Sequence, residues 1–276
     1  MTVQQKFNTL LDTSTATAAD QWDDLLSLQV QLFLPQELDF LRGHPAWRAA
    51  ESVLDVGCGN GYYRSQVRSF FPEKSYLGID VSHELVDVAQ RRHSGDGLRF
   101  ERDDFFTGTQ NRPFDVILLR FVLQHLDDFP AILAAAARRL RPGGSLFIVE
   151  PSLAESETWP ATPLFTGLLE AFERRQSEFG RLRTKIADIG GLIAGHPHWR
   201  LTRQTALSVP RLGPFAGSAT LATFGRWIDL CERAGGFDYP FGEARSEIAD
   251  WGRSTAAFSR IVLRVINLTL ADRDGG

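Results

Sequence analysis

Along the chain, short runs of apolar residues alternate with longer stretches in which apolar and polar residues recur at helical spacing. The apolar runs predict strands, of which five follow one another between residues 51 and 150 and two come later. They are Ser52–Val56, Ser75–Ile79, Leu98–Arg102, Phe114–Leu119, Ser145–Val149, Trp199–Val209 and Ile261–Leu270. Because near-continuous apolar strands that alternate with helices form parallel sheets covered on both faces, the pattern predicts a doubly wound α/β fold.

The amphipathic stretches predict helices with recognisable ends. Ser82 suits the cap of one helix, and Pro130 suits the first turn of another that Asp127 and Asp128 introduce. An apolar face from Asp20 to Leu34 predicts a helix before the first strand, and we expect Pro35 to stop it. After residue 150 the pattern predicts helical additions: one helix with Phe165 on its apolar face, and an insert between residues 210 and 257.

Composition narrows the class of protein. The chain has 276 residues, of which 43% are hydrophobic and 23% charged, and its formal net charge is -4. Ordinary globular composition without a basic surplus argues against a nucleic-acid partner. Two cysteines, Cys58 and Cys231, do not make a disulfide framework. We see neither a signal peptide nor an apolar run of membrane-spanning length, so we expect a cytoplasmic protein with no membrane partner.

The strongest local signal is a glycine loop that follows the first predicted strand. Val53–Val56 runs directly into Gly57-Cys58-Gly59-Asn60-Gly61. Alternate glycines let the backbone turn sharply and approach a ligand without obstruction by Cβ atoms. A dinucleotide-binding fingerprint would require a sixth-position glycine, where Tyr62 stands instead. The loop therefore favours a ligand without a pyrophosphate and argues against NAD.

A carboxylate ends the second apolar run. Asp80 follows Tyr76-Leu77-Gly78-Ile79, so it should lie beside the glycine loop at the carboxyl edge of the sheet. There it can accept hydrogen bonds from a ribose diol. Alternatively, Asp80 simply begins the helix that follows.

Several motifs in order resemble those of class I S-adenosylmethionine (SAM)-dependent methyltransferases. Asp55–Gly61 resembles the family's first motif, Phe114–Leu119 with Val122–Leu126 its fourth strand and following helix, and Leu140–Leu146 the turn into its fifth strand. The resemblance covers roughly residues 50–150. It implies a Rossmann-like, mostly parallel seven-stranded sheet whose last strand is antiparallel, with N-terminal helices and helical substrate-cap insertions. It also implies one methyltransferase domain over residues 1–276, with an N-terminal helical cap (1–50), a SAM-binding core (51–150) and substrate-side insertions that include the last two strands (151–276).

The resemblance also implies the residues that bind SAM. The loop would wrap the aminocarboxypropyl group, the acid after the second strand would bind the ribose, and the acid after the third would contact the adenine amino group. Either of two neighbouring acids fits this last role. Arg120 and Phe121 lie just past the fourth strand, at the edge where doubly wound sheets bind ligands, and could touch SAM or the substrate; alternatively they are a surface arginine and a core phenylalanine. The full candidate set is Asp55, Gly57, Cys58, Gly59, Gly61, Asp80, Val81, Asp103, Asp104, Phe105, Arg120 and Phe121.

Catalytic and substrate-binding residues are less clearly marked. SAM carries its own electrophilic methyl group, so a methyltransferase needs no nucleophile of its own. His125 is the candidate base, with a packing role as the alternative. Neither a zinc-like spacing nor a convincing magnesium site is present, and we expect no metal. Aromatic residues in the N-terminal cap and in the insertions after residue 150 are candidates for substrate contact. They are Trp22, Phe33, Trp159 and Phe165. Alternatively, these side chains only pack the cap and the insertions onto the sheet.

The sequence thus predicts methyl transfer from SAM to an O, N or C atom of a small molecule, with specialised metabolism as one setting. An RNA- or protein-directed methyltransferase stays open, as does a SAM-binding protein that transfers no methyl group. Monomer and homodimer are both compatible with the pattern.

Overall fold

One mixed sheet organises the molecule. The computed structural model describes residues 16–108, 113–235 and 238–271, and its seven strands lie in the order β3-β2-β1-β4-β5-β7-β6. They are β1 (Ser52–Val56), β2 (Ser75–Asp80), β3 (Leu98–Arg102), β4 (Phe114–Arg120), β5 (Leu140–Trp159), β6 (Trp199–Leu212) and β7 (Phe258–Leu270). The first five pair in parallel, and β7 pairs antiparallel with both β5 and β6. The predicted strands and the antiparallel last strand are confirmed.

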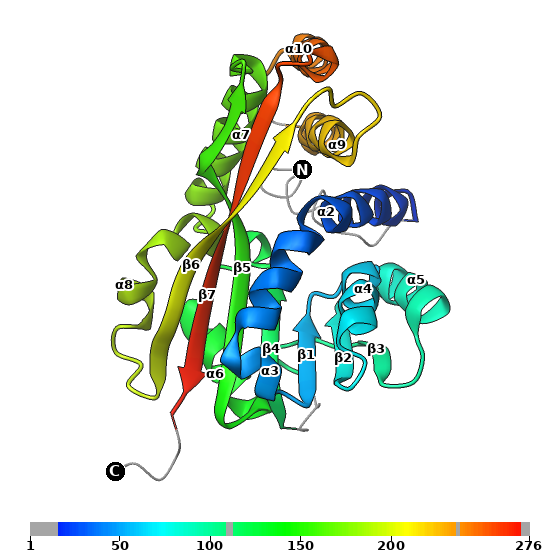
Figure 1. Cartoon of the computed structure of the whole chain (residues 1–276). Helices are drawn as coiled ribbons and strands as arrows, with labels where there is room; N and C mark the ends of the chain where they lie inside the picture. The colour runs from blue at the N-terminus through cyan, green and yellow to red at the C-terminus, as the bar shows by residue number, and fades with distance from the viewer. Residues whose placement is uncertain (1–15, 109–112, 236–237, 272–276) are drawn as a thin grey trace.

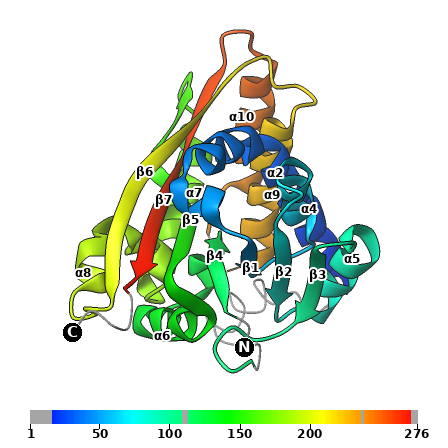
Figure 2. The same cartoon turned by 60° about the horizontal axis from the view of Figure 1, so that its bottom comes forward.

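Helices cover both faces of the parallel part (Figures 1 and 2). They are α4 (Tyr62–Phe70), α5 (His83–His93) and α6 (Phe129–Arg139). Ser82 caps α5 by accepting a hydrogen bond from the Leu85 amide at 3.3 Å, and Asp128 caps α6 through the Ala131 amide at 2.9 Å. Because side chains alternate along a strand, Val53 and Leu54 of β1 enter separate hydrophobic clusters on opposite faces.

The N-terminal helix is longer than the sequence predicts. α2 (Ala16–Gly43) continues through Pro35 instead of ending there, and α3 (Pro45–Ala49) follows it. Proline removes one backbone hydrogen bond, but Leu38 and Leu41 beyond it are buried and hold the second half of the helix on the core. Figure 1 shows the two halves of α2 lying at an angle to each other. Residues 1–15 of the predicted helical cap lie outside the described ranges.

The second half of the chain extends the sheet on one side. β5 continues to Trp159, well past the predicted Val149, because β7 pairs with it almost to its end after an irregularity between Ser152 and Glu157. The extended ends of β5, β6 and β7 rise beside three helices (Figure 1). These are α7 (Pro163–Glu178), α9 (Ala219–Ala234) and α10 (Phe241–Arg253), and shorter helical segments are η1 (Leu123–His125), η2 (Leu182–Thr184), η3 (Ile186–Asp188) and α8 (Ile189–Ile193).

These additions have a core of their own. Phe165 and Leu168 of α7 pack with Phe224 of α9 and Trp251 of α10 in a third hydrophobic cluster. The predicted helical insert between residues 210 and 257 therefore consists of α9 and α10. No helix in the described ranges is long and apolar enough to cross a membrane.

Candidate functional site

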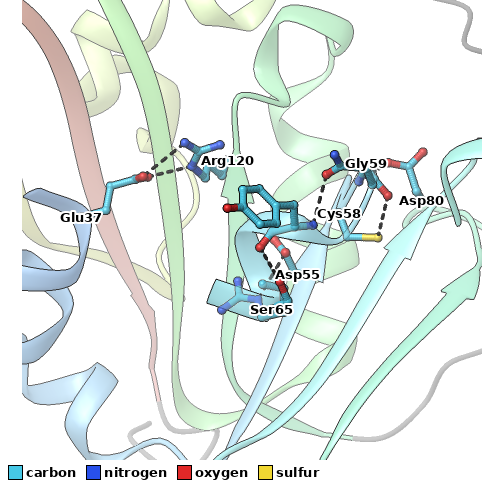
Figure 3. A network of polar contacts seen from close by, with 10 residues as sticks. Glu37, Asp55, Cys58, Gly59, Ser65, Asp80 and Arg120 are labelled. Carbon is cyan, nitrogen blue, oxygen red and sulfur yellow. Dashed lines mark hydrogen bonds and ion pairs between the residues drawn. The ribbon is translucent and has the colours of Figure 1, made fainter. Parts of the chain in front are cut away.

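The glycine loop and the second-strand carboxylate meet at the carboxyl edge of the sheet. The Gly57 amide donates to the Ile79 carbonyl at 2.8 Å, which brings the start of the loop against the end of β2. The Gly59 amide donates to Asp80 Oδ2 at 2.9 Å, and Figure 3 shows the two residues side by side. The loop and Asp80 therefore face one ligand position.

Glycine is required in this loop for two reasons. Gly57, Gly59 and Gly61 all have positive φ angles, of 69°, 54° and 75°. A Cβ atom on Gly59 would also lie 2.6 Å from Leu26 Cδ1 of α2, inside van der Waals contact. The loop thus combines a left-handed backbone with close approach of the N-terminal helix.

A cavity of about 420 Å³, the glycine-loop cavity, opens between this loop, Asp80 and α2. Most of the residues that the family resemblance implies for SAM line it: Gly57, Gly59, Asp80, Val81, Asp103, Asp104, Phe105, Arg120 and Phe121. Trp22, Leu26 and Gln29 of α2 close it from the other side. Sequence reasoning had no signal for Gln29, whose neighbours show only helical periodicity.

Three predicted loop residues do not line this cavity. Asp55 is buried beneath the loop and accepts a hydrogen bond from Arg64 Nε at 3.3 Å. Arg64 is fully buried among the rings of Trp47, Tyr63 and Tyr76. The carboxylate of Asp55 therefore supports the loop from below rather than facing the ligand position.

Cys58 and Gly61 also serve the loop's packing. Burial raises the pKa of the Cys58 thiol well above its ordinary value, so the thiol is protonated and unsuited to act as a nucleophile. Gly61 precedes α4, and a Cβ atom there would lie 2.7 Å from Phe100 Cζ of β3. Its lack of a side chain lets α4 begin close to the sheet.

Asp80 keeps its carboxylate at the cavity wall through backbone hydrogen bonds. Oδ1 accepts from the Ser82 amide and Oδ2 from the Gly59 amide, each at 2.9 Å. Burial raises the pKa of Asp80, and these two amides oppose that rise. Each oxygen retains a lone pair, so the group can accept further hydrogen bonds from a diol.

A strained turn follows β4. Phe121 has a φ of 60°, the one positive φ at a non-glycine position in the described residues, and its amide donates to the Val149 carbonyl at 2.8 Å. Two residues later, the Leu123 amide donates to Glu150 Oε1 at 2.7 Å. Strained conformations of this kind persist where surrounding contacts impose them, and they concentrate at functional sites.

Two carboxylates that sequence reasoning missed hold this region. Glu150 directly follows the apolar run of β5, the same kind of position as Asp80, and this signal could have identified it. Glu37 of α2 pairs with Arg120 at the end of β4 through contacts of 2.8 and 3.2 Å (Figure 3). Nothing local marks Glu37, because its partner lies far away in the sequence.

His125 lines the glycine-loop cavity but is poorly suited to act as a base. Burial, with a smaller contribution from Arg181, lowers its pKa to about 4. Its imidazole is therefore neutral at physiological pH but has little affinity for a proton. The ring of Trp22 lies 6.3 Å from it, centroid to centroid.

A second cavity of about 290 Å³, the aromatic cavity, adjoins the first. Its wall includes the predicted Phe33 and Phe165, together with Phe121, Phe172, Phe224 and Trp227. Gln29 and Phe121 line both cavities, so the two meet at these side chains. Of the other predicted substrate residues, Trp22 lines the glycine-loop cavity, whereas Trp159 is 68% exposed and lines neither.

Comparison with known proteins agrees with this geometry. A family model described as a methyltransferase domain matches residues 26–207, well over half of the chain. The trans-aconitate 2-methyltransferase of Deinococcus radiodurans is 32% identical over 139 residues, which cover 50% of this chain and 51% of that protein. The ubiquinone biosynthesis O-methyltransferase of Actinobacillus pleuropneumoniae is 30% identical over 148 residues, 50% and 62% of the two chains. The chain thus spans about half the length of the curated relatives it matches.

One solved structure shows the same fold, and a second is similar over most of its length. A Bacillus halodurans protein assigned to the methyltransferases superposes with a TM-score of 0.52 at 16% identity, over 85% of this chain and 98% of that one. A SAM-dependent methyltransferase from Thiobacillus denitrificans, crystallised with S-adenosyl-L-homocysteine, gives a TM-score of 0.49 at 19% identity, over 86% and 91%. Because the methyltransferase-domain model matches well over half of its residues, the chain belongs to the methyltransferase-domain family.

Proposed function

We propose that this protein transfers a methyl group from SAM, bound in the glycine-loop cavity, to a small organic acceptor bound in the aromatic cavity. The observation that carries the proposal is the meeting of the two cavities at Gln29 and Phe121. Methyl transfer requires donor and acceptor to be held in line at short range, and adjoining cavities provide this arrangement.

The residues of the glycine-loop cavity fit SAM. Asp80 has spare acceptor capacity for the ribose diol. Asp103 lines the same cavity, and its buried Oδ2 accepts no hydrogen bond from the described residues. Its Oδ1 is taken by the Asp104 amide at 3.0 Å. A buried acceptor without a donor is costly, and the adenine amino group would supply one.

SAM brings the electrophilic methyl group, so the chain itself has to orient the acceptor and exclude water. Phe121 stands between the two cavities, and Phe33 of α2 packs edge-to-face against it with ring centroids 5.6 Å apart. These rings, with Gln29, wall the passage between donor and acceptor. An apolar wall there keeps water away from the methyl group.

A small molecule fits the acceptor position better than a polymer. The aromatic cavity is of the size of a small organic compound and is lined by side chains from α2, α7 and α9. Two relatives are named for trans-aconitate and for ubiquinone biosynthesis, which concern small molecules. The net charge of -4 offers no general attraction for RNA.

The donor half of the proposal is tested by calorimetric titration with S-adenosylhomocysteine. The Asp80→Ala variant should bind at least about 100-fold more weakly, because two hydrogen bonds to a charged group are worth about 3 kcal/mol together. Asp250→Asn, at an exposed residue of α10, is the matched control and should bind like the wild type. Micromolar binding of NAD without measurable binding of S-adenosylhomocysteine would refute the assignment.

The acceptor half is tested by following labelled methyl from SAM. We expect label in a small-molecule extract of the source cells, and none in tRNA or in protein. Label in tRNA or protein alone would favour a polymer-directed enzyme. No label in any fraction, with S-adenosylhomocysteine still bound, would favour a SAM-binding protein that transfers no methyl group.

A further inference from the structure

Arg183 is a buried cation at the wall of the aromatic cavity. It belongs to η2, which lies beside η1 because the Leu182 amide donates to the Leu126 carbonyl at 2.8 Å. Arg183 lines the cavity although its side chain is only 2% exposed. A guanidinium does not lose its proton in a protein, so a buried one requires hydrogen-bond acceptors around it.

Few acceptors surround Arg183. Its Nη2 donates to Glu173 Oε1 at 3.4 Å, near the upper limit for a hydrogen bond. Its Nε and Nη1 donate to no group in the described part of the chain. The ring of Phe172, 5.6 Å from Cζ, adds only a cation–π contact. Since buried donors are almost always satisfied, a missing acceptor at this position is the simplest explanation.

The nearby glutamates offset the charge of Arg183 but accept no hydrogen bond from its Nε or Nη1. Glu150 commits Oε1 to the Leu123 amide, and burial raises its pKa to about 7 although Arg183 acts to lower it. Glu150 is therefore only partly ionised near neutral pH. Glu150 does not itself line the cavity; of the carboxylates that do, Glu157 pairs with Arg260 at 2.8 Å and Glu170 is exposed. Within the described ranges, Glu173 alone accepts a hydrogen bond from Arg183.

The rest of the wall is mostly apolar, although Gln29, Thr223 and the lining glutamates named above also contribute to it. Phe165 and Phe224 stack at a centroid distance of 4.5 Å, and Phe33 and Trp227 complete an aromatic lining. Such a surface favours a ring or a hydrocarbon chain over a polar body. The cavity thus combines one buried cation with a mostly apolar, largely aromatic lining.

We propose that the acceptor is an organic acid, with a carboxylate that pairs with Arg183 and an apolar body that packs against the aromatic rings. This inference rests on the proposed function, because it places the acceptor in the same cavity. Arginine suits the role, since its planar guanidinium forms strong charge-assisted hydrogen bonds with carboxylates. The incoming carboxylate would take the donors that Nε and Nη1 leave free and would displace the long contact with Glu173.

The test compares three probes with one carbon skeleton: 3-phenylpropanoate, 3-phenylpropanamide and 3-phenylpropylamine. Each is titrated by calorimetry into the protein saturated with S-adenosylhomocysteine. We expect the acid to bind at least tenfold more tightly than the amide and the amine. In Arg183→Met the affinity for the acid should fall to that for the amide. In Arg183→Lys the acid should still bind more tightly than the amide, by a smaller factor than in the wild type. Arg174→Met, at an exposed arginine of α7, should behave like the wild type.

The same titrations separate this inference from the proposed function. If S-adenosylhomocysteine does not bind the wild type, the proposed function fails. If S-adenosylhomocysteine binds but the acid binds no more tightly than the amide or the amine, only the organic-acid inference is overturned. The same holds if the acid does not bind at all. An acid preference that persists in Arg183→Met overturns it as well. Should Arg183→Met fail to fold, the wild-type ranking and Arg183→Lys still decide the matter.

Discussion

Replacing Glu37 with glutamine tests how the N-terminal helix is held on the sheet. The Glu37–Arg120 pair is bidentate, at 2.8 and 3.2 Å, and its side chains are only 3% and 6% exposed. Arg120 also lies 4.3 Å from the ring centroid of Tyr63 and 4.0 Å from that of Phe121. These rings keep the guanidinium from reaching water when its partner is removed. Glu37→Gln therefore leaves a buried cation with one neutral acceptor in place of a carboxylate.

The expected cost follows from that geometry. Removing one partner of a buried ion pair costs about 3–5 kcal/mol, and the remaining amide oxygen places Glu37→Gln near the lower value. In a chain of this length a loss of about 3 kcal/mol lowers Tm by roughly 6–12 °C. Because α2 contributes Trp22, Leu26 and Gln29 to the glycine-loop cavity, binding of S-adenosylhomocysteine should weaken at the same time.

Urea unfolding and calorimetry measure both effects. The matched control is Asp39→Asn, which removes the carboxylate of an exposed pair on the same helix, where Asp39 is 78% and Arg42 51% exposed. This control should leave Tm unchanged, since exposed ion pairs contribute little. The double variant Glu37→Leu/Arg120→Met should recover much of the loss, because apolar side chains need no partner. A loss below about 1 kcal/mol in Glu37→Gln would refute the reasoning.

Two further predictions concern pH. Burial raises the pKa of Glu150 from 4.5 to about 7. Between these pH values the folded state keeps a proton that the unfolded chain loses, so the free energy of unfolding should fall by about 3 kcal/mol as pH rises from 4.5 to 7. Urea unfolding of Glu150→Gln should lack this fall, and a constant difference from the wild type between pH 4.5 and 7 would contradict the prediction. Burial holds the pKa of His125 at about 4, so His125→Gln should leave the shape of the S-adenosylhomocysteine affinity profile unchanged between pH 5.5 and 8. A step near pH 6.5 in the wild type that the variant lacks would show that His125 titrates there after all.

The sequence predicts the fold around the glycine loop well because its signals are local. An apolar strand followed by alternate glycines can form few structures, and Asp80 is placed by its position at the end of the next strand. The errors arise where distant contacts override a local signal. Pro35 is a helix breaker by itself, yet Leu38, Leu41 and Glu37 beyond it are each fixed by the core. Likewise, the polar stretch after Val149 becomes a strand only because β7 pairs with it.

The aromatic cavity is harder to predict because its proposed chemistry depends on one buried charge. α7 and α9 show the same helical periodicity whether they cover a cavity or a packed core, so their aromatic residues do not identify a site. Arg183 lies in a short helical segment where an arginine would ordinarily be exposed, and only the fold buries it between Glu150, Glu173 and the aromatic rings. Because Arg183 lines the aromatic cavity and not the glycine-loop cavity, its substitution should change which acceptor binds and leave S-adenosylhomocysteine binding intact. Under the proposed function, donor and acceptor recognition would thus be encoded in separate parts of the chain, joined through Gln29 and Phe121.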